Sequence, residues 1–219
     1  MITEFYESID STNSEASRQL DILSGTTCGF SALHKKVICA KTQTAGRGRM
    51  NRSFFSPSSG VYMSLIYCPE QRDVFDPAFY TAAAAVSVCR TVSKFFKKET
   101  TIKWVNDIYS DGKKISGILT EGKIDSFTGK IGAIVVGIGV NVNTPKNGFP
   151  EEIKNRAGAI LEKEIDFDFR VFVDALAEEV FKVFDLIPDS VNQVMNEYRN
   201  KSNLIGKKVA VTPVIESDE

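Results

Sequence analysis

Arginine and glycine alternate in one polar segment of this chain, and together these residue types suit the binding of an anion. The segment, residues 41–52, reads KTQTAGRGRMNR and has no hydrophobic period. A guanidinium presents a planar fork of donors that fits phosphate or carboxylate, and glycine lets the backbone approach a ligand closely. Taken alone, the segment is compatible with an anionic small ligand, with nucleic acid or with an exposed surface loop.

Two further polar stretches flank a turn. Residues 103–109 read KWVNDIY and residues 113–119 read KKISGIL, and the sequence SDGK at positions 110–113 is typical of a hairpin turn. A lone Asn-Asp pair usually marks only a turn. We expect this hairpin, however, to bring Asp107 near Lys114 and to hold its ammonium group in place.

Glycines also occur inside a predicted strand, where residues 137–143 read GIGVNVN. Such glycines indicate either close approach of a ligand or a buried strand that packs poorly. Two partial nucleotide-binding motifs do not hold. Residues 117–123 match the first seven positions of a P-loop, but Ile124 replaces the required Ser or Thr, and residues 46–51 lack the third glycine of a dinucleotide-binding turn.

Composition narrows the function classes. The 219 residues include 27 Lys and Arg against 28 Asp and Glu, and this balance argues against nucleic acid or a membrane surface as partner. His34 is the only histidine, so a His-rich metal site is excluded and a Ser-His-Asp triad would depend on it alone. No CxxC pair exists among the four cysteines. The absence of a signal-peptide core and of a long apolar run predicts a cytoplasmic enzyme with reduced thiols.

Hydrophobic periodicity predicts the elements that position these clusters. A capping box of Thr12 and Glu15 is expected to begin the first helix, and Asp76-Pro77 the second. The predicted helices span residues 12–23, 77–96, 169–187 and a shorter stretch to 198. The predicted strands are 4–9, 37–40, 60–67, 101–105, 115–121, 130–142 and 207–212. Strands that pair through hairpins, with helices gathered separately, predict an α+β fold with a mixed, largely antiparallel sheet packed by helices.

The combined pattern resembles the catalytic domain of biotin protein ligases. The resemblance covers nearly all of residues 11–143 and rests on Ser11-Thr12-Asn13 and on residues 43–52, 103–107, 114–119 and 137–141. Lipoate ligases share the fold and a lysine, but they lack this arginine–glycine loop as written. The resemblance implies the biotin/lipoate ligase fold, which is similar to class II aminoacyl-tRNA synthetases, and a monofunctional enzyme without a DNA-binding domain.

The activity that the resemblance implies has two steps. Biotin and ATP give biotinyl-5′-AMP and pyrophosphate, and biotin is then transferred to one lysine of a biotin carboxyl carrier protein domain. ATP and Mg²⁺ are the implied cofactors, with Mg²⁺ bound mainly through the ATP phosphates, and a homodimer is possible. The residue types suit this chemistry, because fixed cations at Lys114, Arg47 and Arg49 would neutralise the charge that develops when a carboxylate attacks an α-phosphate.

The resemblance also assigns roles to individual residues. Those with implied catalytic roles are Lys114, Arg49 and Asp107. Those implied in biotin binding are Ser11, Thr12, Asn13, Gln43, Arg47, Gly48, Arg49, Lys114, Gly117 and Gly139. Those implied in nucleotide binding are Arg47, Arg49, Arg52, Trp104, Asn106, Lys114 and Asn141.

The chain departs from the family pattern at three loop positions. Val105 stands where proline is usual, Asn51 where glycine is common and Phe54 where tryptophan is frequent. None of these changes removes a charge that the mechanism needs. We expect a catalytic domain over residues 1–203, followed over residues 204–219 by the first strand of a truncated or incomplete SH3-like domain. The alternative functions are a lipoate or octanoate ligase, or a binder of biotin or its adenylate without efficient transfer.

Overall fold

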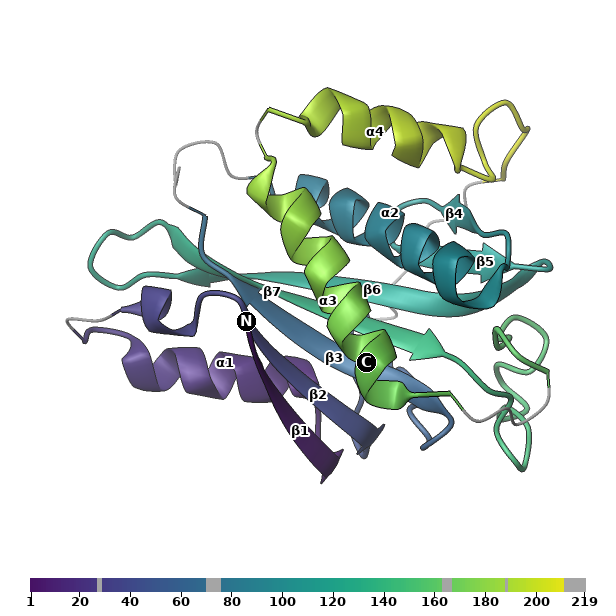
Figure 1. Cartoon of the computed structure of the whole chain (residues 1–219), viewed down its shortest axis with the longest axis horizontal. Coiled ribbons are helices and arrows are strands. Elements are labelled where there is room, and N and C mark those ends of the chain that lie inside the picture. Colours follow the sequence, from purple (N-terminus) through teal and green to yellow (C-terminus); the bar gives the residue numbers. More distant parts are fainter. Residues whose placement is uncertain (27–28, 70–75, 163–166, 188, 211–219) are drawn as a thin grey trace, which may run out of the picture.

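The computed structural model describes residues 1–26, 29–69, 76–162, 167–187 and 189–210. In these residues a mixed sheet has the strand order β1-β2-β3-β7-β6-β5-β4 (Figure 1). The strands are β1 (Ile2–Ile9), β2 (Lys36–Gln43), β3 (Gly60–Tyr67), β4 (Thr101–Lys103), β5 (Asp107–Ser110), β6 (Lys113–Ile124) and β7 (Ile131–Asn141). Only β1 and β2 pair in parallel, so the predicted mixed, largely antiparallel sheet is confirmed.

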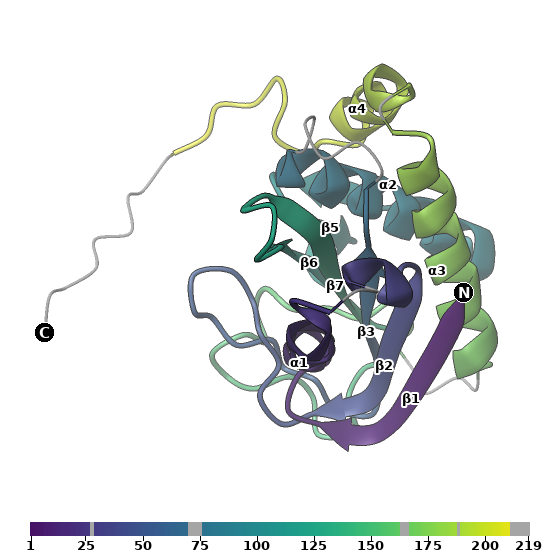
Figure 2. The same cartoon turned by 90° about the vertical axis from the view of Figure 1, so that its left-hand side faces the viewer.

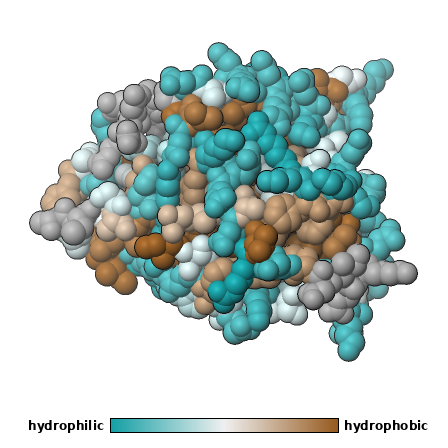
Figure 3. Space-filling model, in the orientation of Figure 1, coloured by the Kyte–Doolittle hydropathy of each residue, from teal (hydrophilic) through white to brown (hydrophobic). Residues whose placement is uncertain are grey.

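Helices cover both faces of this sheet. They are α1 (Thr12–Leu23), α2 (Pro77–Phe96), α3 (Phe169–Asp185) and α4 (Val191–Asn200), with a short 3-10 turn η1 (Phe30–Leu33). The view in Figure 2 shows α1 on one side of the sheet and α2 and α3 on the other. The outer surface of the α2–α4 layer is mostly hydrophilic, with separate hydrophobic patches between the polar side chains (Figure 3).

Alternation along the strands produces the two cores. In β2, Val37 and Cys39 belong to the core under α2 and α3, whereas Ile38 packs with Ala16 and Leu20 of α1. Successive side chains of a strand point to opposite faces, so a near-continuous apolar strand such as β2 is buried on both sides. The sheet is therefore a rigid middle layer, and its strand ends and loops are free to form a site.

The helix starts follow the expected capping rules with one correction. Asp76 accepts from the backbone N–H of Ala78 and Pro77 is the first residue of α2, as predicted. In α1, however, the N-cap is Ser11, whose side chain accepts from the N–H of Ser14, and Thr12 is the first helical residue. The capping box predicted for Thr12 was wrong, because the N–H and the hydroxyl of Thr12 both donate to the side chain of Gln43 in β2.

The segment after α4 corrects a second prediction. Its backbone closes against β4, because the N–H of Ile102 donates to the carbonyl of Lys201 and the N–H of Asn203 donates to that of Ile102. Residues 204–206 then form a turn, and residues 207–210 lie in no strand. The strand expected at 207–212 is therefore not formed over its described part, and residues 211–219, like Pro188, lie outside the described residues.

The edge strand β1 is held by polar contacts as well as by its parallel pairing. The ammonium of Lys36 lies 2.8 Å from Glu4 Oε2 and the Tyr6 hydroxyl donates to Glu4 Oε1 at 2.7 Å. The hydrogen bond from Lys36, followed by that from Tyr6, lowers the pKa of Glu4 to about 2. Ionised Glu4 therefore favours the folded state.

Candidate active site

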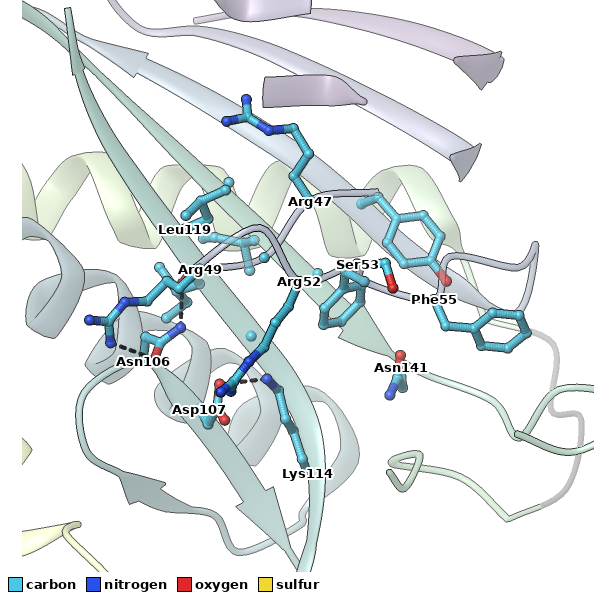
Figure 4. A pocket seen from close by; sticks show the side chains of 18 of the residues that line it. Arg47, Arg49, Arg52, Ser53, Phe55, Asn106, Asp107, Lys114, Leu119 and Asn141 are labelled. Atoms are coloured by element: carbon cyan, nitrogen blue, oxygen red, sulfur yellow. Dashed lines mark hydrogen bonds and ion pairs between the residues drawn. The ribbon is translucent and has the colours of Figure 1, made fainter. Parts of the chain in front are cut away.

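One cavity of about 700 Å³ opens over the β5, β6 and β7 ends of the sheet. Every residue that the sequence singled out for the site lines it, and Figure 4 labels several of them, including Arg52, Lys114 and Asn141. These are Ser11, Thr12, Asn13, Gln43, Arg47, Gly48, Arg49, Arg52, Trp104, Asn106, Asp107, Lys114, Gly117, Gly139 and Asn141. The sequence thus predicted a single site from five separate segments, and the fold brings those segments together.

The arginine–glycine segment is a small hairpin rather than an open loop. The N–H of Gly48 donates to the carbonyl of Arg52 at 2.7 Å, and the N–H of Phe54 donates to the carbonyl of Gly46 at 2.8 Å. At its tip Asn51 has φ +55°, a left-handed conformation that asparagine tolerates better than most residues. The change from the family's common glycine to Asn51 therefore keeps the turn.

The three arginines of this hairpin face different partners. Arg47 forms a double contact with Glu121, with Nη2 2.7 Å from Oε1 and Nη1 3.2 Å from Oε2. Arg49 donates to Asn106 Oδ1 at 3.3 Å. Figure 4 shows Arg47 directed away from the cavity and Arg52 directed toward Asp107 and Lys114. Arg49 and Arg52 are therefore the arginines of this hairpin that can meet an anion in the cavity.

The predicted pairing of Asp107 and Lys114 is confirmed. The β5–β6 hairpin places Asp107 opposite Gly117, and a register shift between Ile108 and Tyr109 precedes the turn. Lys114 Nζ lies 2.6 Å from Asp107 Oδ1, and each side chain is about a quarter exposed. The carboxylate thus orients a lysine ammonium that remains accessible from the cavity.

Polar side chains of α1, β2 and β3 form a buried network at one end of the cavity. Gln43 Oε1 accepts from the N–H of Thr12 at 2.9 Å and from its hydroxyl at 3.2 Å. The Ser64 hydroxyl lies 2.8 Å from Thr12 Oγ1 and donates to Asn13 Oδ1 at 2.6 Å. Ser11, Thr12 and Asn13 are at most 3% exposed. Buried donors and acceptors at fixed positions suit a compact polar head group.

An apolar slot leads from this network toward Lys114. Its floor is formed by Gly117 on β6 and Gly139 on β7, which are paired neighbours in the sheet. A Cβ on Gly139 would lie 2.5 Å from Phe54 Cε1, and one on Gly117 would lie 3.1 Å from Phe54 Cε2. The Phe54 ring therefore lies over both glycines, and any side chain there would displace it or narrow the slot.

Residues after β7 close the other end, and the sequence did not predict them. Backbone hydrogen bonds join Lys114 to Arg156 and Gly158, and Asn141 Nδ2 donates to the carbonyl of Gly158 at 2.9 Å. This segment places Phe149, Ile153, Arg156 and Ala157 in the cavity wall. It has no motif and no period, so no local signal could have indicated it.

Two aromatic residues of the wall were also missed. Phe55 follows Phe54, and its ring lies 6.4 Å from that of Phe149 in an edge-to-face arrangement. Tyr62 is 1% exposed and its hydroxyl donates to the carbonyl of Pro57. Burial raises the pKa of Tyr62 far above its ordinary value, so its hydroxyl stays neutral and acts as a fixed part of the wall.

Trp104 and Val105 mark the outer rim. Trp104 is 72% exposed, so it offers an indole to the mouth of the cavity rather than to the slot. The hydroxyl of Tyr198 in α4 donates to the carbonyl of Val105 at 2.8 Å. The position at which the family usually has proline is thus tied to the helix layer in this chain.

Comparison with known proteins places this geometry in a family. The model described as "Biotin/lipoate A/B protein ligase family" matches residues 7–141, which is more than half of the chain. The chain belongs to this family. The likeness spans the hairpin, the Asp107–Lys114 pair and the paired glycines.

Curated proteins with similar sequences are named as ligases. The bifunctional ligase/repressor BirA of Bacillus subtilis (strain 168) is 41% identical over 125 residues, or 57% of this chain and 38% of BirA. The biotin–[acetyl-CoA-carboxylase] ligase of Mycobacterium tuberculosis (strain ATCC 25618 / H37Rv) is 28% identical over 180 residues, or 80% of this chain and 64% of that protein. The chain therefore spans about two fifths of the length of BirA and less than two thirds of the length of the Mycobacterium tuberculosis ligase.

Among solved structures, the biotin protein ligase from Aquifex aeolicus in complex with biotin and ATP has the same fold. Its TM-score with this ligase-family chain is 0.73 at 23% identity, covering 94% of this chain and 80% of that chain. The predicted fold class is therefore confirmed. Within the described residues, no helix combines the length and apolar character needed to cross a bilayer.

Proposed function

We propose that this chain carries the catalytic unit of an ATP-dependent biotin protein ligase. It would form biotinyl-5′-AMP from biotin and ATP and transfer biotin to a lysine of a biotin carboxyl carrier protein domain. The carrying observation is the order of features along one cavity of about 700 Å³. A buried polar network is followed by a glycine-floored slot and then by a cluster of lysine and arginine side chains.

This order matches the chemical order of groups in biotin. The ureido ring both donates and accepts hydrogen bonds, which suits the hydroxyls and amides of Ser11, Thr12 and Gln43. The aliphatic tail suits the apolar slot lined by the Phe54 ring, which packs on the two paired glycines, because apolar surface is buried there. The carboxylate at the end of the tail then reaches Lys114.

In the first step, a carboxylate oxygen of biotin forms a bond to the α-phosphorus of ATP. The bond from this phosphorus to the bridging oxygen of the β-phosphate breaks, and its electron pair leaves with pyrophosphate. Lys114, oriented by Asp107 at 2.6 Å, neutralises charge at the carboxylate and α-phosphate. Arg49 and Arg52 do the same for the nucleotide phosphates.

Magnesium fits this site through a small set of oxygen ligands. Within the described residues, no three His, Cys, Asp or Glu side chains gather, whereas Mg²⁺ typically takes substrate phosphates together with one or two protein oxygens. The side-chain oxygen of Asn106 lines the cavity and would hold it together with the ATP phosphates. When bound, Mg²⁺ supplies positive charge that offsets the repulsion between the phosphates.

In the second step, the ε-amine of a carrier lysine forms a bond to the biotin carbonyl carbon. The bond from that carbon to the AMP oxygen breaks, AMP leaves, and the amine loses a proton. Backbone hydrogen bonds between Gly46 and Phe54 hold the arginine–glycine hairpin together, so it can close over the adenylate as one unit. Closure keeps water from the mixed anhydride. A homodimer, the identity of the carrier and a cytoplasmic location stay predictions.

Substrate-dependent pyrophosphate release tests the proposal. Purified protein is supplied with ATP and Mg²⁺ and with biotin, lipoate or octanoate, each with and without an acceptor carrier domain. Biotin-dependent release followed by labelling of the carrier lysine is the expected result. Release only with lipoate or octanoate would assign the chain to the other branch of the family, and adenylate without carrier labelling would identify a binder that does not transfer.

A further inference from the structure

Glu121 on β6 holds two site elements at once, although it is not among the residues that the sequence assigned to the site. Its Oε1 and Oε2 accept from Arg47 at 2.7 and 3.2 Å. Its Oε2 also accepts from Asn13 Nδ2 at 2.8 Å. One carboxylate therefore links the arginine–glycine hairpin to the start of α1, where the buried polar network lies. It does so from a side chain that is 30% exposed and is not part of the cavity wall.

The contact with Arg47 acts at the base of the hairpin. Arg47 and Ser53 form a β-bridge across it, and the adjacent N–H groups of Gly48 and Phe54 donate across the same hairpin. Arg47 points away from the cavity in Figure 4. Its guanidinium is thus an anchor for the hairpin, while Arg49 and Arg52 remain available to anions.

The contact with Asn13 fixes an amide in one orientation. Asn13 Oδ1 accepts from Ser64 at 2.6 Å, and its Nδ2 donates to Glu121 at 2.8 Å and to the carbonyl of Leu119 at 3.4 Å, so the amide cannot flip without losing these bonds. A Cβ on Gly137 would collide with Asn13 Oδ1, so β7 carries a glycine where this amide approaches. Since Ser64 also contacts Thr12, the orientation of Asn13 sets that of the polar network.

We propose that Glu121 is a positioning residue that couples the order of the arginine–glycine hairpin to that of the buried polar network. It acts on ligand only through Arg47 and Asn13. Loss of the carboxylate would free the hairpin base and leave a buried amide N–H without a charged acceptor, which loosens both ends of the ligand together. This coupling slows the dissociation of biotinyl-5′-AMP. The statement about the adenylate rests on the proposed function, whereas the statement about the hairpin does not.

The first measurement needs no ligand. Hydrogen exchange of the peptide that covers residues 45–54 is compared between wild type, Glu121→Ala and Lys123→Ala. Lys123 is a matched control, because it lies on the same strand and pairs with Asp21 of the same helix α1 at 2.8 Å. We expect exchange to rise about fivefold to tenfold in Glu121→Ala, the range for a partly exposed ion pair with charge-assisted hydrogen bonds, and to stay at the wild-type rate in Lys123→Ala. Equal exchange in all three proteins overturns the inference.

A double-mutant cycle then tests the route through Arg47. If Glu121 acts on the hairpin through this arginine, Arg47→Ala and Glu121→Ala should each raise the exchange rate of the hairpin. The rate in the double variant should then be less than twice that of the faster single variant. A double variant whose increase in exchange equals the product of the two single increases would show that the residues act independently, which contradicts the proposal. Glu121→Gln retains one acceptor oxygen for the N–H donors of two side chains, Arg47 and Asn13, so its exchange should fall between those of wild type and Glu121→Ala. A Gln variant whose exchange equals or exceeds that of Glu121→Ala also counts against the proposal.

The ligand measurement follows the dissociation of preformed biotinyl-5′-AMP. We expect Glu121→Ala to release biotinyl-5′-AMP about tenfold faster than Lys123→Ala does. The two variants should have the same melting temperature. Equal release rates contradict the coupling. If wild type binds no biotin or adenylate, the proposed function fails, but the exchange data still decide whether Glu121 orders the hairpin. The two failures are therefore distinguishable.

Discussion

Removal of the Lys114 ammonium is expected to slow adenylate formation far more than it weakens biotin binding. Lys114 Nζ lies 2.6 Å from Asp107 Oδ1, and the two side chains are 29% and 26% exposed. Loss of one fixed donor at a developing charge costs ~10²–10³-fold in rate, or ~3–4 kcal/mol. Biotin binding depends mainly on the polar network and the slot, so its dissociation constant should change by less than about threefold, well under 1.4 kcal/mol.

Loss of Lys114 also leaves Asp107 unpaired in a site that gathers anions. Two unit charges ~4 Å apart interact by ~4 kcal/mol at an effective dielectric constant of ~20. Solvent screens much of this at a pair that is about a quarter exposed, which leaves ~1–2 kcal/mol, or about tenfold in rate. Lys114→Ala should therefore lose ~10³–10⁴-fold in total, and adding Asp107→Asn should restore about tenfold.

The assay is single-turnover formation of biotinyl-5′-AMP from labelled ATP by rapid quench, with biotin affinity measured by calorimetry. A wild-type rate in Lys114→Ala would refute the role given to the ammonium. A double variant slower than Lys114→Ala would refute the view that Asp107 serves to orient and balance the lysine, and would give the carboxylate a direct role instead.

Three further outcomes follow from the geometry. Arg49→Ala should release the adenylate roughly tenfold faster, because a charged donor to the phosphates is lost; stopped-flow dissociation measures it. Gly139→Ala should weaken biotin binding at least about tenfold, because its Cβ would lie 2.5 Å from the Phe54 ring; calorimetry measures it. Glu4→Gln should reduce the acid dependence of stability. The pKa of Glu4 is about 2 against a usual 4.5, so its contribution is complete above about pH 4.5 and lost toward about pH 2; at a partly exposed pair it is at most ~1 kcal/mol.

Each outcome has a control or a contradicting result. For the slot, Gly122→Ala on the same strand pair meets only the Ile131 side chain, at 3.1 Å, and should leave biotin affinity unchanged. Wild-type adenylate release in the Arg49 variant would contradict the closing hairpin. For the edge strand, urea unfolding at about pH 6 and pH 3 compares Glu4→Gln with wild type, and identical pH dependence would show that the carboxylate does not favour folding.

The sequence predicted the sheet and the helices well because their signals are local. The near-continuous apolar run of β3 and the Asp76-Pro77 start of α2 are each contained in a few neighbouring residues. The N-cap of α1 was misplaced by one residue because Thr12 is engaged by Gln43, a contact between residues 31 positions apart. The strand expected at 207–212 was predicted from its local apolar pattern and from the resemblance to the family, and residues 207–210 have no neighbouring strand to pair with in the described structure.

The candidate site was predictable where polar residues cluster in the sequence. Asp107 and Lys114 lie on either side of one turn, so their pairing follows from a hairpin alone. The wall formed by Phe149 and Arg156 was not predictable, since it depends on backbone pairing between a motif-free segment and the start of β6. Glu121 was missed for a similar reason, because its role comes from two partners distant in sequence.

Native mass spectrometry of the purified protein incubated with biotin, ATP and Mg²⁺ tests the central claim most directly. A bound species with the mass of biotinyl-5′-AMP should appear only when both substrates are present, and it should be lost when an acceptor carrier domain is added and becomes biotinylated. Protein that carries no adenylate under these conditions, or that forms it only with lipoate or octanoate, would contradict the assignment of this cavity to biotin activation.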